Sequence, residues 1–363
     1  MGRPERRHRA DDGIRTRDPH LGKVMRYQLR YVRAPEAPDR LLGAPPMLQE
    51  RRACEHRPVV LPQQDRRWPK ASDWLAAGPG ERPVDLAVLG VPAFATSLSQ
   101  SGAHATPGAV RRALGRFSTW CASRRLDVAE MVAPWDRGDV ADPDVPVEGE
   151  WRVRTAAETA AAKSRLLLTI GGDNSLSYPV MAGAFGDDLS AAGLVTLDAH
   201  NDLRDGRSNA TPVRDLIEAG LPGEQIVQVG IADWANSRSY ATEAHARGVT
   251  VIGRGEVAGR GIGDCLREAF EIAGAGGGDI YVDLDLDVCD RSVAPACPGA
   301  VPGGLSAAEV LQAAFLSANS PRVRAMDIAE VDATRDAPDE RTISLAAMCL
   351  LEVAAGLALR NDS

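Results

Sequence analysis

The segment GLVTLDAHNDLRD, residues 193–205, carries three potential metal ligands at every second position directly after an apolar run. These are Asp198, His200 and Asp202, and a second apolar run, DIYVDLDLD, ends in Asp285 and Asp287. Residues i, i+2 and i+4 of an extended segment project to one side, so the members of each set can face one point. The spacing therefore predicts a site built from carboxylates and an imidazole.

Several carboxylates in one pocket would repel one another and would be costly to remove from water, unless cations neutralise them. A donor set dominated by oxygen with one imidazole suits Mn²⁺ better than Zn²⁺ or copper, and the imidazole favours Mn²⁺ over Mg²⁺. Two such ions ~3.5–4 Å apart would share a water and lower its pKa towards neutrality. We therefore expect a hydrolytic site with two Mn²⁺ ions per subunit.

The specificity of this signal comes from the combination of the two segments. A D-x-D pair alone is weak, because acidic pairs are common on protein surfaces, and a lone buried histidine is more often structural than metal-bound. Metallophosphoesterases use related pieces in the opposite order with a later Asn-His pair, whereas no histidine here follows an asparagine. The sequence therefore excludes that class.

The elements that position these residues are short apolar runs that alternate with Ala-rich helical stretches from about residue 84 onwards. Strand runs with both faces apolar indicate a sheet that is covered on both sides. Alternation of strands and helices gives parallel βαβ units, so the sequence predicts an α/β fold with one doubly covered parallel sheet.

Polar residues follow four of these strand runs directly. Asp173 and Asn174 follow LLLTI, Asp198 follows LVTL, Asp285 ends its strand, and Glu330 follows AMDIA. Ligands of open parallel sheets gather at the carboxyl ends of the strands, so the four clusters are predicted to meet at one edge.

Composition and charge restrict the class of protein. An apolar content of 44% and a charged content of 25% are ordinary for a soluble globular chain. We identify no secretion signal and no apolar run of the ~18 residues that a membrane helix needs, so we expect a cytoplasmic protein without a membrane partner. Six scattered cysteines with no CxxC pair favour free, mostly buried thiols.

The first part of the chain differs from the rest in charge. Residues 1–70 hold 17 Lys/Arg and 9 Asp/Glu, a net charge of +8, so the remainder carries −16 of the total of −8. We predict a disordered, Pro-rich leader over residues 1–66 and a single domain over residues 67–363. A nucleic-acid-binding arm is disfavoured because the leader lacks regularly interleaved aromatic residues. A further alternative is that translation starts at Met47 and the preceding residues are a start-site artefact.

Four motifs together resemble the ureohydrolase family, which comprises arginases, agmatinases and formimidoylglutamases. They are GGDNS, DAHND, DLDLDVCDRSVAPACPGAVPGGL and AEVDATRDAPDERT, within residues 84–360. The resemblance implies a three-layer αβα fold around an eight-stranded parallel sheet, a pair of Mn²⁺ ions, and homo-oligomers of three or six subunits.

The resemblance also implies roles for individual residues. Asp198 and Asp285 would bridge the two metals, His200 and Asp287 would complete one site, and Asp202 would belong to the other. Asp202 would also assist proton transfer or orient the attacking water. Glu330 matches the acidic position that receives the amidine or guanidine group and would hold its carbon over that water.

Three positions depart from the family pattern. Asn174 stands where the family has a histidine ligand, which predicts a weaker first metal site because a neutral amide oxygen replaces an imidazole. Asp283 stands where serine is usual, so the ligand pair could be Asp283 and Asp285, although Asp290 downstream favours Asp285 and Asp287. Arg291 replaces a proline, which affects a turn more than the chemistry.

The expected substrate follows from two positions, of which the resemblance places Arg204 at the substrate's far end and Asn209 at the position of a proton-shuttle histidine. The guanidinium of Arg204 favours a carboxylate, unless it is a structural partner of Asp205 or another acid, and Arg214 is a candidate second cation. Guanidine-cleaving relatives carry a histidine where Asn209 stands, whereas formimidoylglutamase-like members have a small polar residue before a similar TP turn. Both positions favour N-formimidoyl-L-glutamate, a dicarboxylate that bears an amidine.

The sequence therefore predicts a Mn²⁺-dependent hydrolase that cleaves N-formimidoyl-L-glutamate to L-glutamate and formamide in histidine breakdown. The enzyme alternative is an agmatinase, guanidinobutyrase or arginase-like hydrolase that releases urea from a guanidino compound. The non-enzyme alternative is a metal-poor relative kept for binding or regulation, which Asn174 motivates.

Overall fold

Eight parallel strands form the central sheet in the computed structural model, which describes Asp65 and residues 67–362. Their order across the sheet is β4-β1-β5-β10-β9-β6-β7-β8, and every neighbouring pair is parallel. The strands are β1 (Val84–Val91), β4 (Pro134–Asp139), β5 (Ser164–Gly171), β6 (Gly193–Leu197), β7 (Ile226–Ile231), β8 (Thr250–Gly253), β9 (Ile280–Asp285) and β10 (Val323–Ala329). A separate antiparallel pair consists of β2 (Trp120–Cys121) and β3 (Leu126–Asp127). The predicted α/β fold with an eight-stranded parallel sheet is confirmed.

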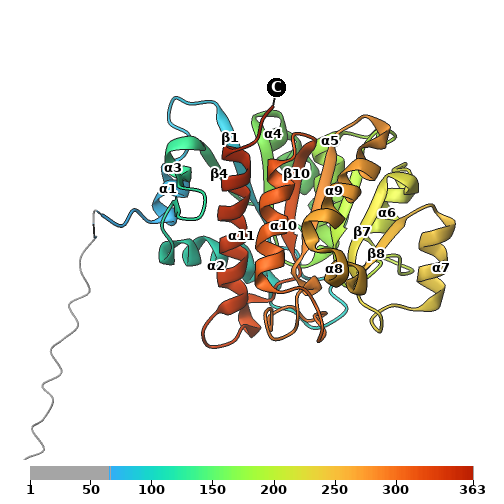
Figure 1. The fold of residues 1–363 in the computed structure, drawn as a ribbon. Helices are drawn as coiled ribbons and strands as arrows, with labels where there is room; N and C mark the ends of the chain where they lie inside the picture. The colour runs from blue at the N-terminus through green and yellow to red at the C-terminus, as the bar shows by residue number, and fades with distance from the viewer. Residues whose placement is uncertain (1–64, 66, 363) are drawn as a thin grey trace, which may run out of the picture. The chain divides into compact units, whose positions relative to one another are not determined.

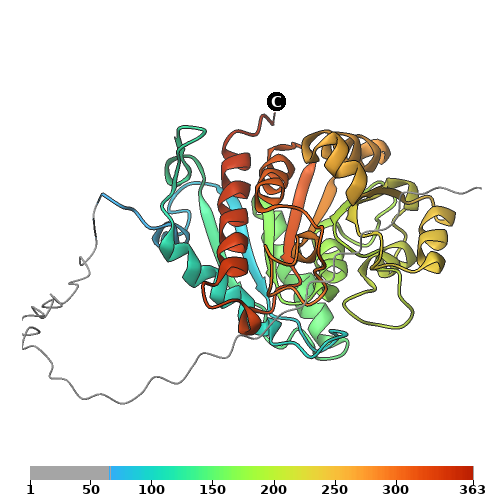
Figure 2. The same ribbon diagram turned by 60° about the horizontal axis from the view of Figure 1, so that its bottom comes forward.

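Helices cover both faces of this sheet, as the views in Figure 1 and Figure 2 show. Helices α2, α9, α10 and α11 belong to one apolar core, whereas α4, α5, α6 and α7 belong to a second core on the opposite face. The helices are α1 (Ala71–Ala77), α2 (Thr106–Ala113), α3 (Val128–Met131), α4 (Glu148–Ala162), α5 (Ser177–Phe185), α6 (Pro212–Glu218), α7 (Arg238–Ala246), α8 (Arg254–Arg260), α9 (Ile262–Ala273), α10 (Ala307–Asn319) and α11 (Arg341–Ala358).

The strands supply alternate side chains to these two cores. In β1, Leu86 and Val88 pack in the first core, whereas Ala87 and Leu89 pack in the second. This period of two is the reason why the strand runs are apolar on both faces, because each face lies under a helical layer.

The chain divides into Met1–Leu61 and a larger unit, Pro62–Ser363, which contains the whole sheet. The leader predicted for residues 1–66 lies, apart from Asp65, outside the described residues, and so does the alternative start at Met47. The domain over residues 67–363 stays a prediction, and its first residue lies five positions after the start of the larger unit.

Strand β4 is an element that the apolar pattern does not reveal. Its sequence, PWDRGD, is polar, and the strand lies at the edge of the sheet, where it pairs with β1 alone. An edge strand needs less apolar surface than an internal one, so the sequence rule for buried strands does not detect it.

Helix α11 corrects the expectation that no apolar stretch is long enough to span a membrane. Its 18 residues have a mean hydropathy of 1.5, which meets the length and composition of a spanning helix. However, 67% of this stretch is buried inside the protein, where it packs in the same core as α2 and α10. Burial in the core therefore explains why the sequence of α11 is so apolar.

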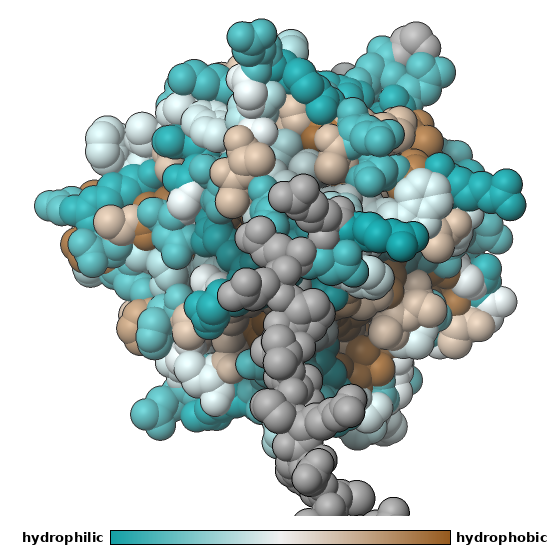
Figure 3. Space-filling model, turned by 90° about the vertical axis from the view of Figure 1, so that its left-hand side faces the viewer, coloured by the Kyte–Doolittle hydropathy of each residue, from teal (hydrophilic) through white to brown (hydrophobic). Residues whose placement is uncertain are grey.

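The surface visible in Figure 3 is mainly polar, and the cysteines of the described residues are free thiols. In the face seen in Figure 3, polar side chains surround smaller apolar areas. Five cysteines lie in the described part of the chain, all as free thiols, and all but Cys121 are buried. The prediction of free, mostly buried thiols is thus confirmed for these five.

Candidate active site

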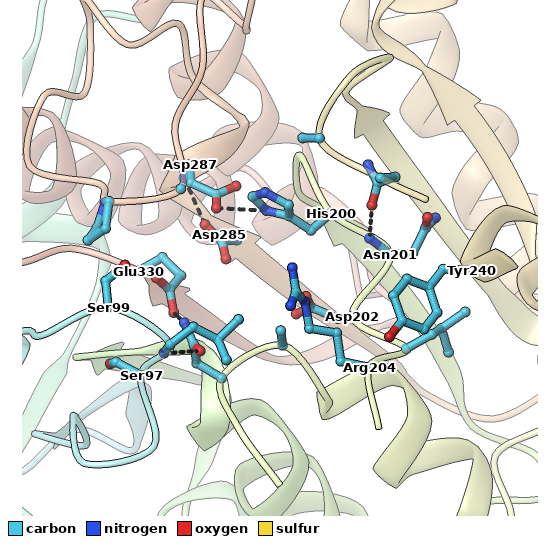
Figure 4. A pocket seen from close by; sticks show the side chains of 18 of the residues that line it. Ser97, Ser99, His200, Asn201, Asp202, Arg204, Tyr240, Asp285, Asp287 and Glu330 are labelled. Atoms are coloured by element: carbon cyan, nitrogen blue, oxygen red, sulfur yellow. Dashed lines mark hydrogen bonds and ion pairs between the residues drawn. The ribbon is translucent and has the colours of Figure 1, made fainter. Parts of the chain in front are cut away.

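The four strands whose ends carry the polar clusters are neighbours in the middle of the sheet, in the order β5-β10-β9-β6. Asn174 follows β5, Glu330 follows β10, Asp285 ends β9, and Asp198 follows β6. A cavity of about 200 Å³ lies at this edge (Figure 4), and the acidic side chains that line it are those of Asp202, Asp285, Asp287 and Glu330. The structure therefore brings together residues that are up to 156 positions apart in the chain, as the Asn174–Glu330 hydrogen bond shows.

Asp198, His200 and Asp287 form a group that could hold a metal ion. One ligand atom from each lies within 4.8 Å of the others. His200 Nδ1 is 2.9 Å from Asp287 Oδ2 and 3.4 Å from Asp198 Oδ1. Asp198 Oδ2 is buried and has no hydrogen-bond partner among the described residues. An unpartnered buried carboxylate oxygen is costly, and a cation at this position would remove the cost.

Backbone contacts fix the two loops that carry this group. The His200 amide donates to Asp198 Oδ1 over 2.7 Å, and the Ala199 amide donates to Asp287 Oδ1 over 3.2 Å. Gly299 lies against this group, because a Cβ atom there would be 2.2 Å from Asp287 Oδ2 and 2.9 Å from His200 Cε1, so a larger residue would displace these side chains. The loop after β6 is thereby tied to the end of β9.

Burial and like charge perturb the acidic groups strongly. Burial first, and then the neighbouring carboxylates, raise the pKa of Asp202 and Asp285 well above the usual value and that of Asp198 to about 6. Burial lowers the pKa of His200, but the hydrogen bonds and charges of Asp198 and Asp287 outweigh it and raise the value to about 12. Bound cations would favour the ionised carboxylates, so the donor set fits divalent metal ions.

Asp202 lies in the cavity although the chain is no longer extended there. Strand β6 ends at Leu197, and Asp202 has φ of 52°, in the left-handed region that is strained for a residue with a side chain. Its Oδ2 accepts a hydrogen bond of 2.8 Å from Asn174 Nδ2. The expected alternation of residues 198, 200 and 202 therefore does not extend to Asp202, which a backbone turn directs towards Asn174.

The structure distinguishes between the two possible registers of the D-L-D-L-D segment. All three side chains are buried, but Asp285 and Asp287 line the cavity and Asp283 does not. Asp283 Oδ2 lies 3.4 Å from Asn174 Nδ2, and Asp283 also contacts Asp327. The register with Asp285 and Asp287 as candidate ligands is thus the one that the geometry supports.

Glu330 lies on the opposite side of the cavity from Arg204 (Figure 4), also with a strained φ of 60°. Its Oε1 accepts hydrogen bonds from the Asn174 amide, over 2.8 Å, and from Asn209 Nδ2, over 2.6 Å. Asn209 Oδ1 in turn accepts from the Leu98 amide over 3.0 Å. Burial, and next the charge of Asp173, raise the pKa of Glu330 to about 8.

The two arginines that were candidates for carboxylate binding have different surroundings. Arg204 lines the cavity and has no ion-pair partner among the residues that the structure describes. Arg214 does not line the cavity, and its guanidinium pairs with Asp205 at 2.7 Å and with Glu243 at 3.6 Å. The prediction of Arg214 as a second substrate cation is therefore not supported, because two carboxylates already use its charge.

Several cavity residues escaped sequence reasoning. Ser97 and Ser99 come from the polar segment that follows β1, and Tyr240 comes from α7. The rule that sites form after strands could have identified the serines, because SLSQSG follows shortly after the first apolar run. The position of Tyr240 on a helix surface gives no comparable signal.

Comparisons with known proteins agree with this geometry. A family model described as "Arginase family" matches residues 84–356. The chain is 34% identical over 313 residues to a formimidoylglutamase of Halalkalibacterium halodurans, which covers 83% of this chain and 96% of the relative. It is 29% identical over 278 residues to an agmatinase of Chromobacterium violaceum, covering 72% of this chain and 81% of the relative.

Solved structures show the same likeness. The formimidoylglutamase of Bacillus subtilis superposes with a TM-score of 0.75 at 29% identity, covering 84% of this chain and 96% of that chain. The formiminoglutamase of Trypanosoma cruzi with Mn²⁺ superposes with a TM-score of 0.72 at 25% identity, covering 81% of this chain and 100% of that chain.

Proposed function

The chain belongs to the arginase family of metal-dependent hydrolases that act on linear amidines, and from this premise we propose that its substrate is N-formimidoyl-L-glutamate. Water would cleave the C–N bond of the formimidoyl group and release formamide and L-glutamate, a step of histidine breakdown. The observation that carries the proposal is Arg204, a cation without an ion-pair partner in the described part of the chain, in a small cavity whose other charged side chains are mostly acidic.

Arg204 gives the cavity a site for an anionic group. Its guanidinium can form two parallel hydrogen bonds to a carboxylate, and such charge-assisted bonds are stronger than neutral ones. Asp205 does not compete for it, because that carboxylate pairs with Arg214. A substrate with an amidine at one end and carboxylates at the other matches Glu330 and Arg204 on opposite sides of the cavity (Figure 4).

We propose that Asp198, His200, Asp285 and Asp287, with Asp202 and Asn174, would hold two Mn²⁺ ions. The unpartnered Asp198 Oδ2 and the raised pKa values of Asp202 and Asp285 support a cationic centre at this edge. The related formiminoglutamase of Trypanosoma cruzi was solved with Mn²⁺. When bound, such ions lower the pKa of a water towards neutrality and so supply a nucleophile.

Glu330 would pair with the cationic amidine and set its carbon in place. Its Oε1 is fixed by Asn174 and Asn209, so the carboxylate can hold the substrate without losing much conformational entropy. Asp202 lines the same cavity, so its carboxylate is placed to accept a proton from the attacking water. Asn209 has no titratable proton, and its side chain connects Glu330 to the Leu98 amide through two hydrogen bonds.

The alternative is release of urea from a guanidino compound. Agmatinases are among the relatives, and their identity to this chain is only a few percentage points lower than that of the formimidoylglutamases. Agmatine-like substrates carry an ammonium group at the far end, and Arg204 would repel it. The cation in the cavity therefore favours an acid over a diamine derivative.

A substrate panel tests the proposal. The Mn²⁺-loaded protein would be assayed for formamide from N-formimidoyl-L-glutamate and for urea from agmatine, arginine and guanidinobutyrate. We expect the highest kcat/KM for N-formimidoyl-L-glutamate. A higher kcat/KM for any guanidino compound would overturn the choice of substrate, and no turnover with no bound Mn²⁺ would favour the metal-poor, non-catalytic alternative.

Two further properties stay proposals. We propose a cytoplasmic location and, on the basis of the family resemblance, a homo-oligomer of three or six subunits. Light scattering of the purified protein would measure the subunit number, and a monomer would contradict the second proposal.

A further inference from the structure

Asn174 presents the two ends of its side-chain amide to different groups. Its Nδ2 lies 2.8 Å from Asp202 Oδ2 and 3.4 Å from Asp283 Oδ2, whereas its Oδ1 lies 2.7 Å from Ser177 Oγ. The side chain is fully buried. In this arrangement the amide donates to the carboxylates at the proposed metal site, and the oxygen, which alone can bind a cation, is turned away from them.

The Ser177 hydroxyl has two acceptors and one hydrogen. Its Oγ lies 2.7 Å from Asn174 Oδ1 and 2.8 Å from Asp327 Oδ2, and both of these oxygens need a donor. Asp327 Oδ2 also accepts from the Tyr281 hydroxyl at 2.5 Å. With the Asn174 oxygen towards Ser177, one of the two short contacts of Ser177 is left without a hydrogen atom.

Exchanging the two ends of the amide gives each short contact of Ser177 one hydrogen atom. The nitrogen and oxygen of an asparagine amide have nearly the same shape, so the exchange moves no heavy atom. The Asn174 NH₂ then donates to Ser177 Oγ, and the Ser177 hydroxyl donates to the Asp327 carboxylate, a charge-assisted bond. The same exchange turns the amide oxygen towards the carboxylates of Asp202 and Asp283, where acceptors would face one another unless a cation lies between them.

We propose that Ser177 is a positioning residue that directs the Asn174 amide oxygen to the first metal position by accepting a hydrogen bond from its nitrogen. The Ser177 hydroxyl donates its hydrogen to Asp327, so its oxygen can accept a hydrogen bond from the Asn174 nitrogen. Asn174 is thereby a metal ligand in the cation-bound protein and a hydrogen-bond donor to Asp202 in its absence. This inference rests on the proposed metal-dependent function.

A titration of the full-length protein with Mn²⁺ tests the inference. Binding is measured as the decrease in the electron paramagnetic resonance signal of the free ion. Ser177→Ala should weaken the weaker of the two Mn²⁺ sites by about 10- to 100-fold, the usual effect of removing a group that orients a metal ligand. The stronger site should change by less than about twofold. Ser175→Ala is the matched control, because its hydroxyl lies in the same turn but bonds to Asp173, and it should leave both sites unchanged.

A double-mutant cycle separates positioning from general damage to the fold. In an Asn174→Ala background, Ser177→Ala should have no further effect on Mn²⁺ affinity, because the group that it positions is already missing. An equal loss in both backgrounds, or no loss from Ser177→Ala in the parent protein, would overturn the role of Ser177.

Two further outcomes complete the test. If Ser177→Ala does not fold, Ser177→Cys tests the same point, because a thiol of similar size is a weak acceptor, and it should also weaken the weaker site. Parent protein that binds two Mn²⁺ ions while the Ser177 variants stay unchanged would overturn only this inference. Parent protein that binds no Mn²⁺ would overturn the proposed metal centre as well.

Discussion

Replacing Arg204 with methionine keeps most of the side-chain volume in the cavity and removes its charge. Arg204 lines the cavity and has no ion-pair partner among the described residues, so its guanidinium is available for a substrate carboxylate. A hydrogen bond to a charged group contributes about 1.5–3 kcal/mol. Because 1.4 kcal/mol corresponds to about a factor of ten, kcat/KM for N-formimidoyl-L-glutamate should fall by roughly 10- to 150-fold.

The assay measures formamide release under Mn²⁺ saturation, with kcat and KM determined separately. A group that binds the far end of the substrate acts in the ground state and in the transition state, so most of the loss should appear in KM. Arg207→Met is the matched control, because Arg207 lies in the same loop but pairs with Glu150 outside this cavity. A loss below about twofold for Arg204→Met, or an equal loss for Arg207→Met, would refute a specific carboxylate site.

Three further perturbations have expected outcomes. Glu330→Gln should lower kcat/KM by roughly 10- to 100-fold, because the amidine cation loses a charge-assisted partner, and an unchanged value would exclude this role. Asn174→His should tighten the weaker Mn²⁺ site by about tenfold or more in a metal titration, because an imidazole replaces an amide, whereas unchanged affinity would show that position 174 supplies no ligand. The metal-free protein should lose thermal stability between pH 5 and pH 8. Folding raises the pKa of Asp198 to about 6 and that of Glu330 to about 8, so the stability linked to these protons is complete below their unfolded values, about 4, and is lost as the pH rises through 6 and 8. Melting temperatures in EDTA and in excess Mn²⁺ check this, and an equal slope in both would contradict a cation at the acidic cluster.

The sequence predicts the internal strands of the sheet well, because their physical cause is local. A strand covered by helices on both faces is buried at nearly every position, as β5 and β6 are, and the mostly apolar runs that result are visible in one sequence. Strand β4 lies at the edge of the sheet and is less buried, so its polar sequence does not indicate a strand. The order of strands across the sheet depends on contacts between distant segments, and periodicity carries no information about them.

The candidate site also has residues that the sequence predicts and contacts that it does not predict. Asp198, Asp285 and Glu330 could be found because a strand end is a predictable place for ligands in a parallel sheet. The surroundings of Arg214 could not be predicted, because they depend on Glu243 of another helix, which lies close only in the folded protein. The hydrogen bonds around Asn174 are likewise a property of packing between β5, β9 and β10, and residue types alone do not indicate them.

The metal positions in a crystal of the Mn²⁺-loaded protein test the central claim most directly. An anomalous difference map recorded at the manganese absorption edge should show density among Asp198, His200, Asp285 and Asp287, with a second, weaker peak beside Asp202 and Asn174. Absence of density at this edge of the sheet under saturating Mn²⁺, or density only elsewhere in the protein, would contradict the proposed hydrolytic centre.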